Sequence, residues 1–197
     1  MRALAAEALG TFVLVFVGTG AVLTLPPFGV ALAFGLAVFA AAGAHINPAV
    51  SLGLWAAGRF PGRRVLPYVL SQVSGALGAS LLLRALFPDH PTLGATLPAG
   101  APLASFALET ALSFLLMYAV LTAYGPAAGA VLGAVVGLEA YFAGPISGAS
   151  MNPARSLAPA LVSFHLEHLW IYLTAPVLGA FLAVRACGCA RGKACCA

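Results

Sequence analysis

Two short stretches of this sequence are near copies of each other: residues 43–51 read GAHINPAVS, and residues 148–156 read GASMNPARS. Asn is a favoured residue at the N-cap of a helix, and Pro is favoured at the first helical position, where its missing N–H costs nothing. Each Asn-Pro pair therefore predicts a helix start, capped by Asn47 in one copy and by Asn152 in the other. A lone Asn-Pro-Ala is typical of an ordinary capped helix, whereas two copies at matched places indicate a shared function.

The apolar pieces that follow the two motifs are too short to cross a membrane. They cover Pro48–Gly58 and Pro153–Val162. A helix of about eleven residues is about 16 Å long. Two such half-helices, entering from opposite sides and meeting at their N-termini, would together cross roughly one membrane thickness.

The composition excludes a water-soluble domain, because 62% of the 197 residues are hydrophobic and 7% are charged. Soluble domains carry about a quarter charged residues. The apolar stretches are too long, and too rich in Ala, Leu and Gly, for the alternating strands of a membrane barrel. We therefore expect one all-α domain over residues 1–186, embedded in the lipid bilayer and without a nucleic-acid partner. The stretches expected to cross the membrane are Leu4–Leu25, Phe28–Gly43, Val65–Phe87, Leu103–Ala123, Ala127–Ala143 and Leu169–Ala186.

The two motifs belong to a duplication of half the protein, with copies at about residues 1–87 and 103–186. Glu7 and Glu109 repeat at an offset of 102 residues, and the motif asparagines repeat at an offset of 105. Each copy holds an odd number of crossing stretches, so the two copies must have opposite orientations in the membrane. Inverted repeats of this kind place their shared site near the bilayer midplane.

The basic residues indicate the orientation. They gather at Arg2, in residues 59–64 and in residues 185–193, whereas the connection 88–102 has none. Because cytoplasmic flanks collect Lys and Arg, both termini are expected in the cytoplasm. The first apolar run is longer than the core of a secretory signal, so it is expected to be retained as a crossing helix. The short loops favour the plasma membrane of a prokaryote.

Two helix starts that face each other predict a pore for uncharged molecules. Their N-termini focus partial positive charge, about half a unit each, at the centre of the membrane. The backbone before each motif is expected to be non-helical, which is tolerated at this depth only where it is buried or lines a wet cavity. Its carbonyls would accept from water and the asparagine amides would donate to it, whereas a cation, hydronium included, would meet an electrostatic barrier. The residues whose backbone is expected to line the pore are Gly43, Ala44, His45, Gly148 and Ser150.

The chain resembles the aquaporin, or major intrinsic protein, family over residues 3–186. The matching segments read AEALGTF at residues 6–12, AHINPAV at residues 44–50 and SMNPARS at residues 150–156. The resemblance implies an aquaporin-like hourglass: six transmembrane helices and two re-entrant half-helices in an inverted repeat, with one pore per subunit and usually a homotetramer. It also implies a set of motif residues at the middle of the pore: Asn47, Pro48, Ala49, Asn152, Pro153 and Ala154.

Members of this family narrow on the outer side of the asparagines, and the resemblance assigns three filter residues from the second motif. Arg155 matches the filter arginine, Ala149 is the loop position, and Ala140 is the position on the fifth helix. Strict water channels of the family have a histidine at the fifth-helix position. Ala140 therefore predicts a wider and less polar filter, open also to glycerol, ammonia, hydrogen sulfide or neutral metalloid acids.

The fourth filter position lies on the second helix and is assigned to Phe34, with Phe28 as the alternative. The local context ALAFG at residues 31–35 matches the family. Phe34 lies thirteen residues before Asn47, about two helical turns closer than in the family. This shortening is expected to alter the cytoplasmic vestibule.

Several ionisable residues lie within or beside the predicted crossing stretches, where such groups are costly and often functional. The resemblance implies that Glu7 and Glu109 accept hydrogen bonds from the loops that hold the half-helices. Glu139 has no repeat partner, and it either lines the outer pore or pairs with a group on another helix. His45 either points into the pore or packs within its loop.

These features favour passive, gradient-driven flux of water, with small neutral solutes as additional cargo. A glycerol, metalloid or ammonia facilitator of the same fold is the alternative, and an ion-coupled transporter or a non-conducting junction protein would belong to other classes. No nucleophile–base pair lies in the membrane region, so no enzyme, cofactor or metal site is expected there. The segment 187–197 holds all four cysteines and is expected to be a reduced, disordered cytoplasmic tail, with binding of soft metal ions as the alternative.

Overall fold

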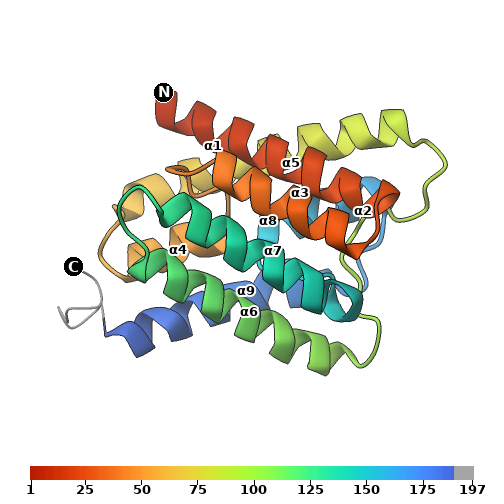
Figure 1. The fold of residues 1–197 in the computed structure, drawn as a ribbon. Coiled ribbons are helices and arrows are strands. Elements are labelled where there is room, and N and C mark those ends of the chain that lie inside the picture. The colour runs from red at the N-terminus through yellow and green to blue at the C-terminus, as the bar shows by residue number, and fades with distance from the viewer. Residues whose placement is uncertain (189–197) are drawn as a thin grey trace.

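The computed structural model describes residues 1–188, and within this range every regular element is a helix (Figure 1). The elements are α1 (Arg2–Val13), η1 (Leu14–Thr19), α2 (Gly20–Thr24), α3 (Pro27–Ala40), α4 (Pro48–Ala56), η2 (Gly62–Arg64), α5 (Val65–Leu86), α6 (Pro102–Thr122), α7 (Ala128–Ser147), α8 (Pro153–Ser163) and α9 (Leu169–Cys187). Here η1 is a π-helical turn and η2 a 3₁₀ turn. Cys187 ends α9 and is buried against the bundle, one residue beyond the predicted end of the last crossing helix. Cys189, Cys195 and Cys196 lie outside the described residues, so the predicted cysteine-rich tail is not described.

Five helical stretches are long and apolar enough to cross a membrane: Arg2–Thr24, Gly62–Leu86, α6, α7 and α9. The second predicted crossing, Phe28–Gly43, is shorter than expected, because α3 has 14 residues. Such a helix is about 21 Å long. The chain leaves the helix at Ala41 and turns at Gly43, where φ is 101°. This end of α3 lies between Phe34 and Asn47, the segment in which the family resemblance implies a shortening, and that shortening stays a prediction.

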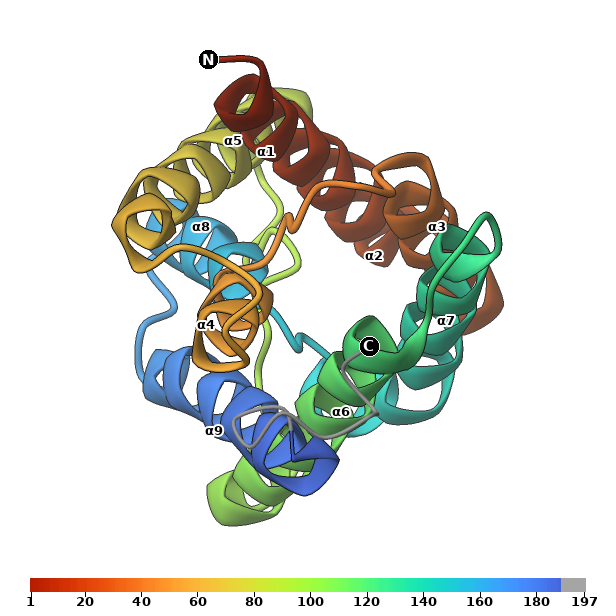
Figure 2. The same ribbon diagram turned by 90° about the vertical axis from the view of Figure 1, so that its left-hand side faces the viewer.

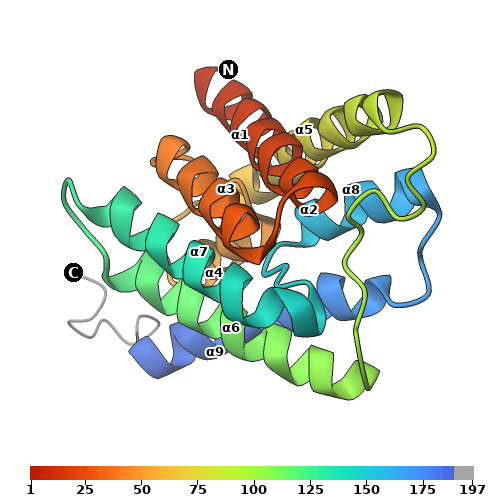
Figure 3. The same cartoon turned by 45° about the vertical axis from the view of Figure 1, so that its right-hand side comes forward.

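The crossing helices form a ring around the two half-helices α4 and α8 (Figure 2). In the first half α1 packs on α5, and in the second half α6 packs on α9. The halves join where α3 packs on α7. In Figure 3 α4 lies behind α3 and α7, and α8 lies to the right of them, between α5 and α9. This is the hourglass arrangement that the resemblance implies.

Glycines let the helices of each half approach closely. A side chain at Gly75 of α5 would overlap the carbonyl of Ala8 on α1, and one at Gly179 of α9 would overlap the carbonyl of Thr110 on α6. Small residues at such contacts bring helix backbones together, as in other membrane bundles. The equivalent packing in both halves matches the predicted inverted repeat.

The start of α1, the α4–α5 connection and the end of α9 lie at one end of the bundle, and the α5–α6 connection lies at the other (Figure 1). We call these the inner and the outer end, after the orientation that the basic residues predict. Large apolar side chains cover the outside of the ring, such as Leu36 at 62% and Phe142 at 71% exposure. An apolar surface of this kind suits contact with lipid tails rather than water.

Candidate functional site: the paired motifs and the constriction

Both motif asparagines cap the helices that follow them. The Oδ1 atom of Asn47 accepts from the backbone N–H of Ala49 at 2.9 Å. The Oδ1 atom of Asn152 accepts from the N–H groups of Ala154 at 3.0 Å and Arg155 at 3.3 Å. The motif prolines occupy the first turn of α4 and of α8. The two helix starts predicted from the Asn-Pro pairs are confirmed.

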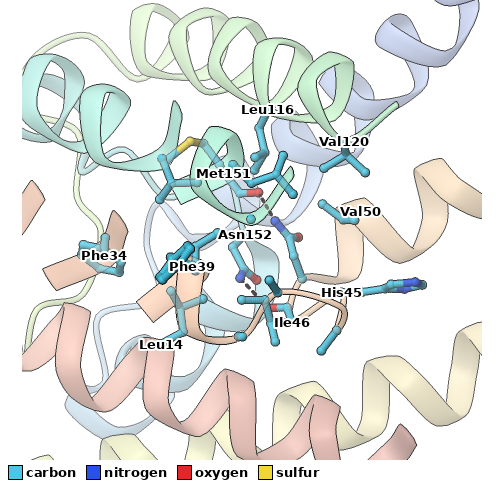
Figure 4. Close-up of a pocket in the computed structure, with 18 of the residues that line it drawn as sticks. Leu14, Phe34, Phe39, His45, Ile46, Val50, Leu116, Val120, Met151 and Asn152 are labelled. Carbon is cyan, nitrogen blue, oxygen red and sulfur yellow. Dashed lines mark hydrogen bonds between the residues drawn. The ribbon is translucent and has the colours of Figure 1, made fainter. Parts of the chain in front are cut away.

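The amide groups of the same two side chains bridge the motifs (Figure 4). The Nδ2 atom of Asn47 donates to the carbonyl of Met151 at 2.8 Å, and the Nδ2 atom of Asn152 donates to the carbonyl of Ile46 at 2.8 Å. A side-chain amide carries two N–H donors. Each asparagine therefore uses one N–H to bond the opposite motif, and no bond of its second N–H is seen within the described part of the chain.

The residue before each asparagine has an unusual backbone conformation. Ile46 has a φ of 48° and Met151 a φ of 52°, in the left-handed region that β-branched and bulky residues rarely enter. In both loops the N–H and the C=O of this residue are held by side chains from elsewhere in the fold. Such strain persists only where the surroundings over-determine it, and it is typical of functional sites.

Glu7 of α1 holds the first loop. Its carboxylate accepts from the backbone N–H of His45 at 2.7 Å and of Ile46 at 2.8 Å. It also accepts from Nε2 of Gln72 on α5 at 2.7 Å. These contacts follow the role that the family resemblance implies for this buried carboxylate, and they add Gln72, which the sequence reasoning missed.

Glu109 of α6 holds the second loop in the equivalent way. Its carboxylate accepts from the N–H of Ser150 at 2.9 Å and of Met151 at 2.8 Å. The hydroxyl of Ser147 is the third donor, at 2.7 Å. The Tyr172 hydroxyl of α9 donates to the Ser147 carbonyl at 2.7 Å and so fixes the end of α7. The two glutamates thus have matching loop contacts in the two halves.

Two serines at matched positions of the repeat strengthen these loops. Ser51 accepts from Nε2 of Gln72 at 3.1 Å. Ser156 accepts from the hydroxyl of Thr96 at 2.7 Å and pairs with the hydroxyl of Ser150 at 2.5 Å. Each of the two serines follows its motif asparagine by four residues. That shared place in the repeat is the signal from which a structural role for them was predictable.

Two cavities approach the paired motifs, an inner one of about 620 Å³ and an outer one of about 400 Å³. The inner cavity is lined by both motif asparagines and by four of the predicted backbone positions, which are Gly43, Ala44, His45 and Ser150. The outer cavity is lined by Gly148 and by residues 94–97 of the α5–α6 connection. Phe34 and Arg155 line both cavities. The boundary between the inner and outer cavities therefore falls at these two side chains.

Arg155 is 3% exposed, yet its guanidinium retains donor capacity. Its Nη1 donates to the carbonyl of Gly94 at 3.0 Å, and its Cζ lies 5.3 Å from the centroid of the Phe34 ring. Its Nε has no hydrogen-bond partner among the residues that the structure describes. The sequence reasoning missed Gly94, because no local pattern shows that the α5–α6 connection folds back over the second motif.

The remaining filter assignments lie around this boundary. Ala140 lines the outer cavity and Ala149 lines the inner one, so neither places a polar side chain there. Phe28, the alternative to Phe34, is 64% exposed and has its ring 6.4 Å from that of Tyr141. The structure thus brings Phe34, and not Phe28, to Arg155.

Glu139 does neither of the two things that its sequence position suggested. It is 8% exposed. Neither carboxylate oxygen has a hydrogen-bond partner within the described part of the chain. It is also not among the residues that line the inner and outer cavities. Its neighbour Ala140 faces the outer cavity, so the carboxylate lies on a different face of α7.

The His45 side chain packs beside its loop and does not point into the pore, which is the second of the two alternatives drawn from the sequence. Its Nδ1 lies 2.9 Å from the hydroxyl of Ser51, and its ring lies 4.6 Å from that of Phe60 and 5.0 Å from that of Tyr68, between centroids. In Figure 4 the imidazole points away from Asn152. Its contribution to the inner cavity is therefore mainly its backbone.

Capped half-helices that meet inside a ring of apolar crossing helices, with a cavity on either side, define a membrane channel of the hourglass class. The sequence matches the model of the major intrinsic protein family over residues 1–186, and the chain belongs to this family. It is therefore a multi-pass membrane protein of a channel-forming family.

Individual relatives agree with this assignment. The chain is 44% identical over 202 residues to aquaporin NIP1-4 of Oryza sativa subsp. japonica, covering 91% of this chain and 73% of that protein. It is 37% identical over 203 residues to nodulin-26 of Glycine max, covering 91% and 74%. The X-ray structure of the aquaglyceroporin from Plasmodium falciparum superposes with a TM-score of 0.81 at 25% identity and covers 93% of each chain. These relatives come from plants and from Plasmodium, and a prokaryotic origin stays a prediction.

Proposed function

We propose that this chain conducts water and small uncharged solutes passively and excludes protons and ions. The observation that carries the proposal is the meeting of the inner and outer cavities at Phe34 and Arg155, beside the paired asparagines. One amide N–H of Asn47 and one of Asn152 remain for a passing oxygen. Carbonyls of the re-entrant loops supply acceptors, so a water molecule can exchange its hydrogen bonds step by step along this path.

Charge exclusion follows from the same geometry. The N-termini of α4 and α8 meet near the middle of the bundle, and each contributes partial positive charge. Arg155 adds a full charge at the constriction and is almost completely buried. A cation that gives up its hydration there meets no carboxylate in the lining of the two cavities, because both loop glutamates accept from the re-entrant loops and Glu139 lines neither cavity.

The chemistry of the constriction favours solutes larger than water as well. Arg155 offers donors to the outer cavity, and Phe34 and Ala140 offer apolar surface to it. A polyol such as glycerol carries both kinds of group, with hydroxyls that can accept from Arg155 and a carbon chain that can contact apolar side chains. The name of the Plasmodium relative, an aquaglyceroporin, supports this reading, and the aquaporin names of the plant relatives support water.

The inner and outer ends of the bundle support a placement in the membrane with the described N-terminus in the cytoplasm. Arg2 and the basic connection at residues 59–64 lie on elements at the same end. Cytoplasmic flanks collect basic residues. We further propose that the protein assembles as a homotetramer in a plasma membrane, as the family resemblance implies.

Stopped-flow light scattering on vesicles reconstituted with the purified protein tests the function. Wild-type vesicles should shrink and reswell faster than empty ones with water, glycerol and ammonia. Arg155→Ala should add a proton and cation leak. Water flux no faster than in empty vesicles would overturn the proposal, and dependence of solute flux on a proton or sodium gradient would favour an ion-coupled transporter instead.

A further inference from the structure

The first crossing helix contains a π-helical turn, η1, at residues Leu14–Thr19. π-turns are rare, occur mostly as single widened turns inside α-helices, and are frequent at functional sites. The sequence of the turn, LVFVGT, contains no proline that would account for the widening. The turn packs against α3, the helix that carries Phe34.

Gly18, in this π-turn, provides the seat for the Phe34 ring. A Cβ atom built on Gly18 would overlap three ring atoms of Phe34, namely Cδ1, Cε1 and Cζ. The edge of the ring therefore occupies the space that a side chain at position 18 would fill. The guanidinium of Arg155 lies 5.3 Å from the ring centroid. Gly18 thus fixes the position of the ring edge, while Arg155 lies over the face of the same ring.

Thr19, the next residue of the same turn, supports Arg155 through Gly94. Thr19 is fully buried, and its methyl group lies against Gly94, where a Cβ would meet it at 2.6 Å. Gly94 has a φ of 68°, and its carbonyl accepts from Nη1 of Arg155. The Thr19 hydroxyl has no hydrogen-bond partner among the residues described. Its contact with Gly94 is therefore made by the methyl group.

We propose that η1 sets the aperture of the constriction, with Gly18 acting through Phe34 and Thr19 acting through Gly94. Both are positioning residues that determine which neutral solutes pass. A water molecule is small enough to pass a narrow aperture. A polyol of glycerol size needs the wider aperture that results when the Phe34 ring is seated against Gly18. This inference rests on the proposed function, since it assumes that Phe34 and Arg155 bound the conducting path.

The test compares glycerol and water permeability of reconstituted vesicles at equal protein content. Gly18→Ala should displace the ring from its seat toward the two cavities that it lines, lowering glycerol permeability about tenfold while water permeability stays within about twofold. Gly18→Ala combined with Phe34→Leu should restore glycerol permeability, because the smaller side chain removes the overlap. Gly20→Ala is the matched control, since its Cβ meets only the end of the Leu83 side chain on α5, at 3.3 Å, and it should leave the permeability ratio unchanged.

Thr19 gives a second, independent pair of variants should Gly18→Ala fail to fold. Thr19→Val keeps the methyl group and should leave the glycerol-to-water ratio unchanged. Thr19→Ser removes it and should raise the ratio about threefold or more, because Gly94 and Arg155 lose their support. An unchanged ratio in both Gly18→Ala and Thr19→Ser would overturn the inference. A wild-type protein that conducts neither water nor glycerol would instead overturn the proposed function.

Discussion

Asn47 and Asn152 each donate a side-chain hydrogen bond to the carbonyl that precedes the other in the sequence, at 2.8 Å in both cases. Each side chain also caps its own half-helix through Oδ1. In each asparagine, the amide oxygen therefore bonds its own half of the protein and the amide nitrogen bonds the other half. A solute at this point meets donors whose orientation is fixed by both half-helices at once.

Replacing Asn152 by Asp separates the capping role from the donor role. Aspartate still accepts from the first turn of α8, so the free energy of unfolding should change by about 1 kcal/mol or less from the cap itself. The carboxylate cannot donate to Ile46, and its negative charge offsets the positive field of the helix starts. We expect proton permeability to rise about tenfold, measured with a pH-sensitive dye inside vesicles. Unchanged proton permeability in a folded variant would contradict the proposed barrier.

Replacing Glu7 by Gln should destabilise the fold. Glu7 is 1% exposed and accepts from His45, Ile46 and Gln72. An amide offers one acceptor oxygen instead of two and directs its NH₂ group at a donor, which costs about 2–4 kcal/mol at a buried site. Thermal unfolding in detergent should show a clearly lower midpoint. Glu167→Gln, at an exposed position, is the control and should unfold like the wild type.

Replacing Ala140 by His should make the constriction selective for water. Ala140 lines the outer cavity beside Phe34 and Arg155. An imidazole there fills space and adds a polar group, so glycerol permeability should fall about tenfold and water permeability should stay within about threefold. Ala140→Ser, a small polar substitution, separates polarity from size. Equal glycerol flux in wild type and Ala140→His would show that this position lies off the path.

Replacing Ser156 by Ala should loosen the outer loop. Its hydroxyl joins Thr96 of the α5–α6 connection to Ser150 of the second re-entrant loop. Removing this buried partner should cost about 1–3 kcal/mol and speed amide hydrogen exchange in residues 93–97. Ser74→Ala serves as the control, because that hydroxyl is exposed and bonds only within its own helix to Leu70. Faster exchange confined to α8 would contradict the role assigned to Thr96.

The helix starts and the two loop glutamates were predictable from the sequence because their chemistry is local or repeated. Asn47 and Asn152 precede prolines, and capping depends on the next few residues only. Glu7 and Glu109 stand out because a carboxylate is costly in a crossing helix and because the repeat presents it twice. The serines at positions 51 and 156 carried the same repeat signal.

Other parts of the site depend on contacts that no local pattern reveals. The positive φ of Ile46 contradicts the preference of a β-branched residue, and it arises from bonds to Glu7 and Asn152, far away in the sequence. The carbonyl of Gly94 accepts from Arg155 because the whole α5–α6 connection folds back over the second motif. The π-turn at Leu14–Thr19 has no distinctive residue pattern, and α3 ends at Ala40 rather than at Gly43 because the chain turns early toward the first motif.

The crossed amide bonds also have a consequence for biosynthesis. The partners of these bonds are 104 and 106 residues apart, so the first re-entrant loop leaves the ribosome long before the second one exists. Until Met151 is made, Asn47 has no carbonyl to receive its amide, and the carbonyl of Ile46 has no donor. Within the first half, the contacts of Glu7 and Gln72 can hold the first re-entrant loop at that stage, and the two crossed bonds can form only when the second half has been translated and inserted.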